Sequence, residues 1–366
     1  MGSFYPVNLT QTVKSVTLTV ATDLEDVGKL EAEWNVLWQT CGNTTPFQSP
    51  AWLLPYLHVF KPGPFKVLSI RRRERLIAVI PITIVRSGGQ AVLRLLGQEV
   101  SDYMDGLCVE EDRVEVYSLI QEWLVNELAC CEFAEFVQLQ SHALLRSMPT
   151  PGSVHEEVRP GTPCPTVHLQ QPDTGTVLSL TESMKKRVNV SFRQLRRIGN
   201  IDLRLADRQT LDTAISDLFI LHAKRWQRQG LPGIFANSDT QMFFRKAFHK
   251  LERASALRLF TLYLDKVAIA SLAAFCKDRI LYYYIGAFDP DYARFGPGNL
   301  IVLHVMEFAI REGYETFDFL RGCEPYKYEW GAQNQSTYIR KLWWPRKQEA
   351  YQQALTSVPK CESRNS

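Results

Sequence analysis

The chain has 366 residues, of which 45% are hydrophobic and 22% charged, with a formal net charge of +3. These proportions are typical of soluble globular proteins and argue against a disordered chain. The net charge is too small to indicate a nucleic-acid-binding protein from bulk electrostatics, so a basic function would have to come from a local cluster.

The sequence shows no clear pattern for disulfides, a metal site, a signal peptide or a membrane span. The eight cysteines include no CxxC pair, so we expect neither a disulfide framework nor a zinc site. Residues 1–20 lack the pattern of a signal peptide, and the longest apolar run, 76–85, is about half a bilayer span. We therefore expect a cytoplasmic protein without a metal, for which peripheral contact with an acidic membrane stays open.

In the first half, residues at helical spacing alternate with short β-branched runs. The expected elements, in chain order, are a strand at 16–20, helices at 23–38 and 50–60, a hairpin of strands at 65–70 and 76–85, strands at 92–96 and 104–109, a helix at 114–128 and a strand at 135–140. Thr22 or Asp23 is the expected N-cap of the first helix.

Six prolines fall within residues 149–176, which predicts a crossing segment between two halves. We accordingly predict an N-terminal domain at 1–150, a crossing segment at 151–176, a C-terminal domain at 177–346 and a polar tail at 347–366.

The second half repeats the order of the first. Its expected elements are helices at 180–198, 212–228 and 239–253, strands at 202–206, 257–264, 267–276 and 280–288, a helix at 299–311, a strand at 316–320, a short helix at 326–330 and a strand at 336–343. The stretch 65–140 corresponds to 259–322. This repeat predicts a duplicated α/β fold, in which each half is a mixed, mostly antiparallel sheet flanked by helices.

A glycine-rich turn between a strand and a helix is the most informative segment. Gly296, Gly298 and Asn299 follow an aromatic strand and open an apolar helix, where backbone N–H groups and the helix dipole favour a pyrophosphate. Arg294 would add a charge-assisted contact. The pattern lacks the third glycine of a Rossmann turn, which disfavours a dinucleotide-binding site. It also lacks the lysine of a P-loop, which excludes a P-loop NTPase.

The corresponding turn of the first half carries Glu110, Glu111 and Asp112. Carboxylates repel phosphates, so we expect the first half to bind no such ligand. The prediction is one ligand site per chain, in the second half.

At this point the sequence resembles the GNAT-type acyltransferases related to cellulose-biosynthesis protein CelD, which are similar to FemAB-type peptidyltransferases. The resemblance covers about residues 20–345. It rests on PFQSPAW at 46–52, HAKRWQRQG at 222–230, YIGAFD at 284–289, GPG at 296–298, FDFLRG at 317–322 and YKYEW at 326–330. It implies two packed GNAT folds, an acyl-CoA donor and an amine acceptor. The basic position of the family's phosphate turn corresponds to Ala293, with Arg294 one place later.

Acyl transfer to an amine requires a bound thioester, stabilisation of an oxyanion and protonation of the departing thiolate. Backbone N–H groups around Tyr284, Ile285 and Gly286 would polarise the thioester carbonyl. We predict that Lys327 places a cation beside the oxyanion or an acceptor phosphate. Tyr326 or Tyr328 would protonate the thiolate, and Tyr326 is the preferred candidate. A structural role on an amphipathic helix is the alternative for both.

His222, Arg225 and Trp226 share one helix face, which makes His222 a candidate base and the other two candidate acceptor contacts. Asp318 and Arg321 end a strand beside the expected site, either as substrate contacts or as a structural ion pair. No nucleophile with a base at recognisable spacing is present, which favours direct transfer.

Two other functions stay open at this level. An aminoacyl-tRNA-dependent peptidyltransferase would use the six cations between Lys185 and Arg197, although the long helical insertion typical of such proteins is absent. A non-catalytic accessory protein of exopolysaccharide synthesis would not need intact glycines at 296 and 298. The first hypothesis therefore remains an N-acyltransferase acting on an envelope, polysaccharide or lipid precursor; the sequence does not predict its oligomeric state.

Overall fold

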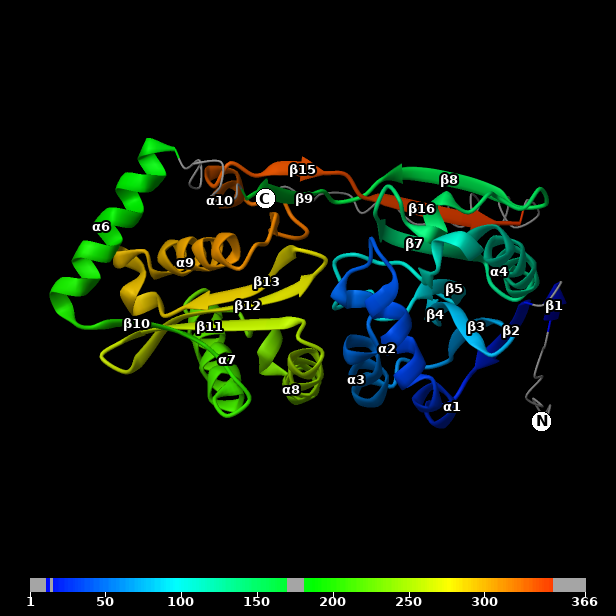
Figure 1. Ribbon diagram of the computed structural model, residues 1–366, viewed down its shortest axis with the longest axis horizontal. Helices are drawn as coiled ribbons and strands as arrows, with labels where there is room; N and C mark the ends of the chain where they lie inside the picture. The colour runs from blue at the N-terminus through cyan, green and yellow to red at the C-terminus, as the bar shows by residue number, and fades with distance from the viewer. Residues whose placement is uncertain (1–10, 14–15, 170–180, 345–366) are drawn as a thin grey trace, which may run out of the picture.

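The computed structural model describes residues 11–13, 16–169 and 181–344, which form two mixed sheets flanked by helices (Figure 1). The predicted fold class, a mixed α/β protein with two similar halves, is confirmed. None of the helices in these ranges is long and apolar enough to cross a membrane.

The first sheet has β5 and β7 as a parallel pair, and its remaining pairs are antiparallel. In spatial order its strands are β1 (Gln11–Val13), β2 (Val16–Ala21), β3 (Phe65–Arg72), β4 (Arg75–Ser87), β5 (Gln90–Leu95), β7 (Phe133–Leu139), β16 (Tyr338–Trp343) and β8 (His155–Pro160), with β6 (Leu107–Cys108) paired to β4. Its helices are α1 (Leu24–Lys29), α2 (Glu31–Thr40), α3 (Pro50–Phe60), α4 (Arg113–Leu128) and α5 (Leu144–Ser147), with short 3-10 turns η1 (Pro46–Gln48) and η2 (Glu110–Asp112).

The second sheet has β13 and β14 as its parallel pair. In spatial order its strands are β10 (Ile201–Leu205), β11 (Leu257–Leu264), β12 (Val267–Lys277), β13 (Ile280–Phe288), β14 (Thr316–Asp318), β9 (Cys164–His168) and β15 (Gln333–Gln335). Its helices are α6 (Glu182–Ile198), α7 (Leu211–Gln227), α8 (Ser238–Arg253), α9 (Pro297–Arg311) and α10 (Pro325–Glu329), with 3-10 turns η4 (Ile234–Ala236) and η5 (Pro290–Phe295). Helix α9 covers one face of this sheet, and α7 and α8 cover the other (Figure 1).

The predicted repeat is present in the topology. Strands β3, β4 and β5 form an antiparallel meander, and α4 then leads to β7, which is parallel to β5. Strands β11, β12 and β13 form the same meander, and α9 leads to β14, which is parallel to β13. The chain therefore uses one strand arrangement twice.

The boundary between the halves differs from the predicted one. The segment predicted to be a crossing contains two strands: β8 joins the first sheet, whereas β9 joins the second. Strand β16, from the end of the predicted C-terminal domain, lies between β7 and β8 in the first sheet. The many prolines of this segment predicted a loop rather than strands. Proline is nevertheless tolerated in a strand at a position whose N–H is not needed for pairing. The predicted tail lies outside the described residues.

Smaller differences concern single elements. Asp23 caps the first helix as predicted, with its carboxylate accepting from the N–H of Asp26. That helix is interrupted at Leu30, so α1 and α2 replace one long helix. Of the strand expected at 104–109, only β6 forms.

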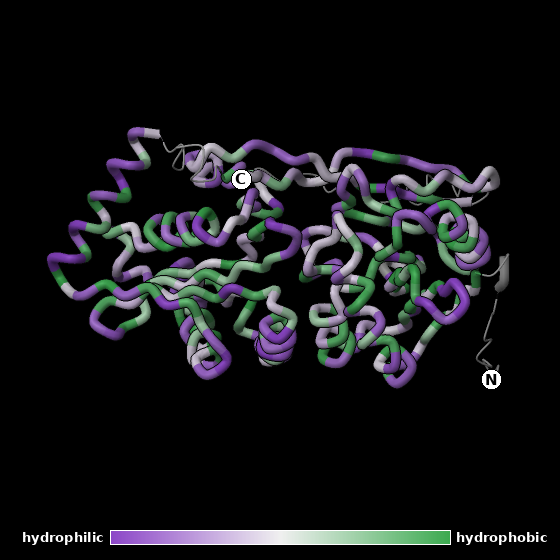
Figure 2. Tube along the Cα trace, in the orientation of Figure 1, coloured by the Kyte–Doolittle hydropathy of each residue, from purple (hydrophilic) through white to green (hydrophobic). Residues whose placement is uncertain are grey.

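One hydrophobic core joins the two halves. The buried Trp52 of α3 has its ring centroid 4.8 Å from that of Phe243 on α8 and 5.2 Å from that of Phe275 on β12. Tyr284 of β13 lies 5.3 Å from the same tryptophan and donates a hydrogen bond to the carbonyl of Val100. Figure 2 shows hydrophobic residues concentrated in the inner strands of both halves, while α6 is largely hydrophilic.

Candidate functional site

The second sheet opens between β13 and β14. These strands pair over 280–282 and 316–318 and no further within the described residues, so β13 continues with its β14-facing edge unpaired. A bulge at Tyr284 interrupts the pairing of β13 with β12, because Ala273 opposes Ile285 while Ala274 opposes Tyr283. Bulges turn the backbone locally and often lie beside active sites. The opening therefore presents backbone polar groups that can bind a ligand.

A cavity of about 270 Å³ lies at this opening. It brings together five residues predicted for the site: Arg225, Gly286, Gly298, Asn299 and Tyr326. They come from α7, β13, the start of α9 and α10, which are distant in sequence. Tyr283, Phe288, Ile301 and Val302 also line the cavity. Sequence reasoning missed these four, although Phe288, Ile301 and Val302 immediately flank the predicted glycine turn.

The glycine turn before α9 requires its glycines for backbone conformation and close packing. Gly296 adopts φ +61, a left-handed conformation that favours glycine, and a Cβ there would lie 2.8 Å from the hydroxyl oxygen of Ser191 on α6. A Cβ on Gly298 would lie 3.3 Å from the ring of Phe288. Pro297 occupies the first helical position, so the N–H groups of Gly298 and Asn299 are the first donors of α9.

Arg225 is held at the cavity by its surroundings. Its guanidinium lies 5.1 Å from the centroid of the Phe288 ring and donates to the carbonyl of Gly286 at 3.4 Å. Arg294, predicted to contact a phosphate, is exposed, with its guanidinium 4.6 Å from the ring centroid of Phe295, and does not line the cavity. Arg225 is therefore the better placed of the two to meet an anionic ligand.

Two tyrosines lie together in the cavity wall. The Tyr283 hydroxyl covers Gly286, where a Cβ would lie 2.2 Å from it. Tyr326 packs edge-on against Phe319, with ring centroids 6.1 Å apart, and is 36% exposed. Burial raises the pKa of Tyr326, and the neighbouring Tyr283 and Glu324 raise it further; burial also raises the pKa of Tyr283. Both phenols are therefore proton donors at neutral pH.

Lys327 does not meet the prediction of a cation beside the oxyanion. Its side chain is 3% exposed, and its ammonium donates to the carbonyls of Leu320, Arg321 and Gly322 at 2.9–3.1 Å. An ion pair with Glu324 at 2.9 Å completes its contacts. The ammonium thus holds the turn between β14 and α10 and lies outside the cavity lining.

His222 is also poorly placed to act as a base. It is 4% exposed, its Nδ1 has no hydrogen-bond partner, and its ring lies 4.7 Å from that of Phe235. Burial, with a smaller contribution from Arg225, lowers the pKa of His222 to about 4. The predicted neighbour Trp226 packs beside His222 at 5.8 Å and does not line the cavity.

Asp318 and Arg321 connect the halves. Asp318 accepts hydrogen bonds from the hydroxyl of Tyr103 and the N–H of Leu320, both at 2.7 Å. Arg321 pairs with Asp102 at 2.9 Å. Arg321 thus pairs with Asp102 rather than with Asp318 as expected, and both residues make structural contacts to the first half.

Tyr284 and Ile285 contribute backbone to the opening while their side chains pack into the shared core. The ring of Tyr284 stacks on Phe275 at 4.6 Å. The described residues contain no group of three or more His, Cys, Asp or Glu positioned to hold a metal.

Comparison with known proteins supports this reading of the fold. Residues 182–328 match the acetyltransferase (GNAT) domain family. No curated protein sequence matches the chain. Among solved structures, FemX is similar with a TM-score of 0.62 and 11% identity, over 88% of this chain and 98% of FemX.

Two further structures are similar over the same extent. The C-terminal domain (DUF2156) of a putative lysylphosphatidylglycerol synthetase from Agrobacterium fabrum has a TM-score of 0.59 and 12% identity, over 90% of this chain and 96% of that one. L-PGS from Bacillus licheniformis has a TM-score of 0.54 and 12% identity, over 89% of this chain and 95% of the L-PGS chain. Residues 182–328 therefore match the acetyltransferase (GNAT) domain family, and they lie within a mixed α/β fold whose two halves repeat one strand arrangement.

Proposed function

We propose that this protein is an N-acyltransferase that moves an acyl group directly from an acyl-CoA thioester to a primary amine. The observation that carries the proposal is the cavity at the open edge of β13, which the start of α9 also lines. The geometry suits a pyrophosphate-bearing donor, because Gly298 and Asn299, whose N–H groups open α9, border this cavity.

Different residues of the cavity have different roles in the proposed reaction. The N–H groups of Gly298 and Asn299 bind the pyrophosphate, and Arg225 adds a cation near the same anion. Unpaired backbone N–H groups of β13 near Gly286 polarise the thioester carbonyl and stabilise the oxyanion. The acceptor amine then forms the C–N bond as the C–S bond breaks.

Tyr326 is the proposed general acid. The phenol is protonated at neutral pH and lines the cavity, so it can deliver its proton to the departing thiolate. The amine gives up one proton to solvent, and a proton from solvent restores the phenol. Ser271, the buried hydroxyl in the cavity wall, already donates to the carbonyl of Phe260, which favours direct transfer over a covalent enzyme intermediate.

The acceptor is proposed from the resemblance to CelD-like proteins: an amine of an envelope, polysaccharide or lipid precursor. The exposed cations of α6, among them Lys186, Arg193 and Arg197, support peripheral contact with an acidic membrane. The same basic face is the observation that favours the second candidate, an aminoacyl-tRNA donor.

A thermal-shift panel tests the donor. Purified protein is heated with free CoA, acetyl-CoA, and medium- and long-chain acyl-CoAs, and we expect a rise in Tm that depends on chain length. Gly298→Glu should abolish the rise, since its side chain places a carboxylate in the cradle beside Phe288. Gly152→Glu is the matched control, because Gly152 is exposed with nothing within 4 Å of its Cβ position.

No shift with any thioester, or an equal loss in both variants, would overturn the acyl-CoA proposal. A shift with aminoacyl-tRNA alone would identify the second candidate. Unfolding of each variant in urea without ligand checks that Gly298→Glu is folded.

A further inference from the structure

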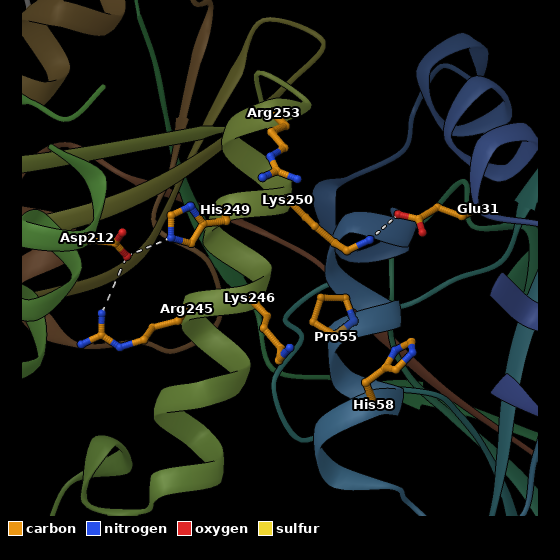
Figure 3. Close-up of a pocket in the computed structure, with 9 residues that line it drawn as sticks. All are labelled: Glu31, Pro55, His58, Asp212, Arg245, Lys246, His249, Lys250 and Arg253. Carbon is orange, nitrogen blue, oxygen red and sulfur yellow. Dashed lines mark hydrogen bonds and ion pairs between the residues drawn. The ribbon is translucent and has the colours of Figure 1, made fainter. Parts of the chain in front are cut away.

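A second, larger hollow lies where the two halves meet. It has a volume of about 700 Å³ and lies along α8, with walls from α2, α3 and α7 (Figure 3). Its lining is strongly charged, and the acidic and basic residues in it are Glu31, His58, Asp212, Arg245, Lys246, His249, Lys250 and Arg253. We call this hollow the basic groove.

The basic side chains of the groove share one face of a single helix. Arg245, Lys246, His249, Lys250 and Arg253 follow the spacing at which helical side chains are neighbours. Like charges four residues apart destabilise a helix by about 0.2–0.5 kcal/mol per pair. Packing of α8 against α3 depends on its aromatic residues, such as Phe243, and does not require these charges.

Three of these basic side chains are held in position by neighbouring helices. Arg245 donates to the hydroxyl of Ser216 at 3.2 Å and lies 4.0 Å from Asp212, which also bonds His249 at 2.9 Å. Lys250 forms an ion pair with Glu31 of the first half. These contacts use both carboxylates of the groove.

The remaining two cations have no such partner. In the part of the chain that the structure describes, Lys246 and Arg253 are exposed and make neither an ion pair nor a side-chain hydrogen bond. His58, across the groove on α3, uses Nδ1 with the carbonyl of Leu54 at 2.7 Å, which leaves Nε2 for another partner. The groove therefore has an uncompensated positive charge between pre-positioned walls.

The basic groove is separate from the cavity of the proposed acyl-transfer site. Asp212 lies at the start of α7 and Arg225 near its end, which places the two hollows about 20 Å apart along that helix. One ligand group cannot contact the charges of both.

We propose that the basic groove is a second binding site, for an organic ligand carrying a pyrophosphate or phosphate group. Lys246 and Arg253 contact the phosphate oxygens, and His58 Nε2 faces the ligand from the first half. The volume exceeds what an inorganic pyrophosphate fills, so the organic part occupies the remainder, beside Pro55. Because α2 and α3 belong to one half and α7 and α8 to the other, binding strengthens the contact between halves.

Inorganic pyrophosphate is the probe for a local test. In protein with ¹³C-labelled histidine, titration should produce saturable shifts of the ring signals of His58 and His249, each assigned from its His→Gln variant. These rings report on the basic groove and not on the start of α9, so pyrophosphate bound in the proposed CoA cradle does not mimic the result. The outcome is therefore independent of the proposed acyl-transfer function.

The Lys246→Gln/Arg253→Gln double variant should bind pyrophosphate at least tenfold more weakly, given about 1.5–3 kcal/mol for a hydrogen bond to a charged group. Arg86→Gln/Lys266→Gln, which removes two exposed cations outside the groove, should leave the affinity within twofold. Co-sedimentation with phosphatidic acid vesicles distinguishes a lipid headgroup from a soluble ligand. Absence of saturable ring shifts, or equal weakening in both double variants, would overturn the proposal.

Discussion

The two halves share a topology, yet the positions equivalent to the candidate site differ in how they are filled. In the second half, α10 follows β14 and presents Tyr326 to a cavity. In the first half, α5 follows β7, and its Leu144 and Leu145 are buried. The N–H groups of both leucines donate to the carboxylate of Asp105, at 2.6 and 3.1 Å. The first half thus occupies with its own chain the place where the second half has a cavity.

The opening between parallel strands is likewise closed in the first half. The N–H of Met104 donates to the carbonyl of Gln138 on β7 at 3.1 Å, so the segment before β6 pairs with the strand that corresponds to β14. A Cβ on Gly106 would lie 2.8 Å from the side chain of Ile80, which shows how closely this segment packs.

The closing segment also supports the other half. Asp102 pairs with Arg321, and Tyr103 bonds Asp318 beside the end of β14. A duplicated fold therefore provides the same framework twice, and the loop composition decides whether a copy binds a ligand or supports its partner. The predictions below test this division of roles.

The largest expected effect concerns Tyr326, the proposed general acid in the second half. Tyr326→Phe should lower kcat of acyl transfer by about 10²–10⁴-fold with little change in KM, because the ring and its packing on Phe319 are retained. Tyr328→Phe is the matched control, since Tyr328 lies on the same helix, is 37% exposed and bonds Asn334 away from the cavity. Steady-state kinetics with a thioester donor provide the measurement. Equal activity of the two variants would remove Tyr326 from the proposed mechanism.

Truncation of the supporting segment should destabilise the whole protein. Tyr103→Ala removes a 2% exposed ring at the junction of the halves and should cost about 3–5 kcal/mol in the free energy of unfolding. Tyr103→Phe removes only the hydrogen bond to Asp318 and should cost about 1–3 kcal/mol. Urea unfolding followed by fluorescence measures both. A cost near zero for Tyr103→Ala would show that the segment does not support the second half.

Asp318 should make stability depend on pH. Burial, with a smaller contribution from Asp102, raises the pKa of Asp318 from 3.8 to about 7 against the opposing Tyr103 hydroxyl and Leu320 N–H. The folded protein then binds this proton more tightly than the unfolded chain does, so the contribution to stability is lost as pH rises from about 4 to about 7.

Asp318→Asn cannot titrate, so the free energy of unfolding of the variant relative to wild type should increase by about 1.4 kcal/mol per pH unit over that interval. Other groups, including Asp105 with a pKa raised by burial to about 6, titrate in both proteins and cancel in the difference. Urea unfolding of the two proteins at several pH values between 4 and 8 supplies the comparison. Parallel curves would show that Asp318 has an ordinary pKa.

The sequence predicted the fold class and the turn before α9 because both depend on local patterns. Hydrophobic periodicity predicted β13 and α9, and the glycines at 296 and 298 predicted the turn that the structure shows. The sequence pattern could not predict that β16 joins the first sheet, because strand partners distant in sequence leave no local signal. Lys327 was assigned from a motif of the resemblance, and His222 from the helix face that it shares with Arg225 and Trp226. Burial, which depends on the tertiary fold, argues against both assignments.

The smallest expected effect separates charge from packing as the reason that the first half has no ligand site. Neutralising the exposed carboxylates with Glu110→Gln/Glu111→Gln should leave acyl-CoA binding at one site per chain, because residues such as Met104 and Leu144 still fill the opening. Stability should change by no more than about 0.5 kcal/mol, as for most surface substitutions. Isothermal titration calorimetry gives the stoichiometry directly. A second equivalent of acyl-CoA in this variant would mean that the carboxylates alone block the first half, and that the closure by its own chain opens when a ligand is available.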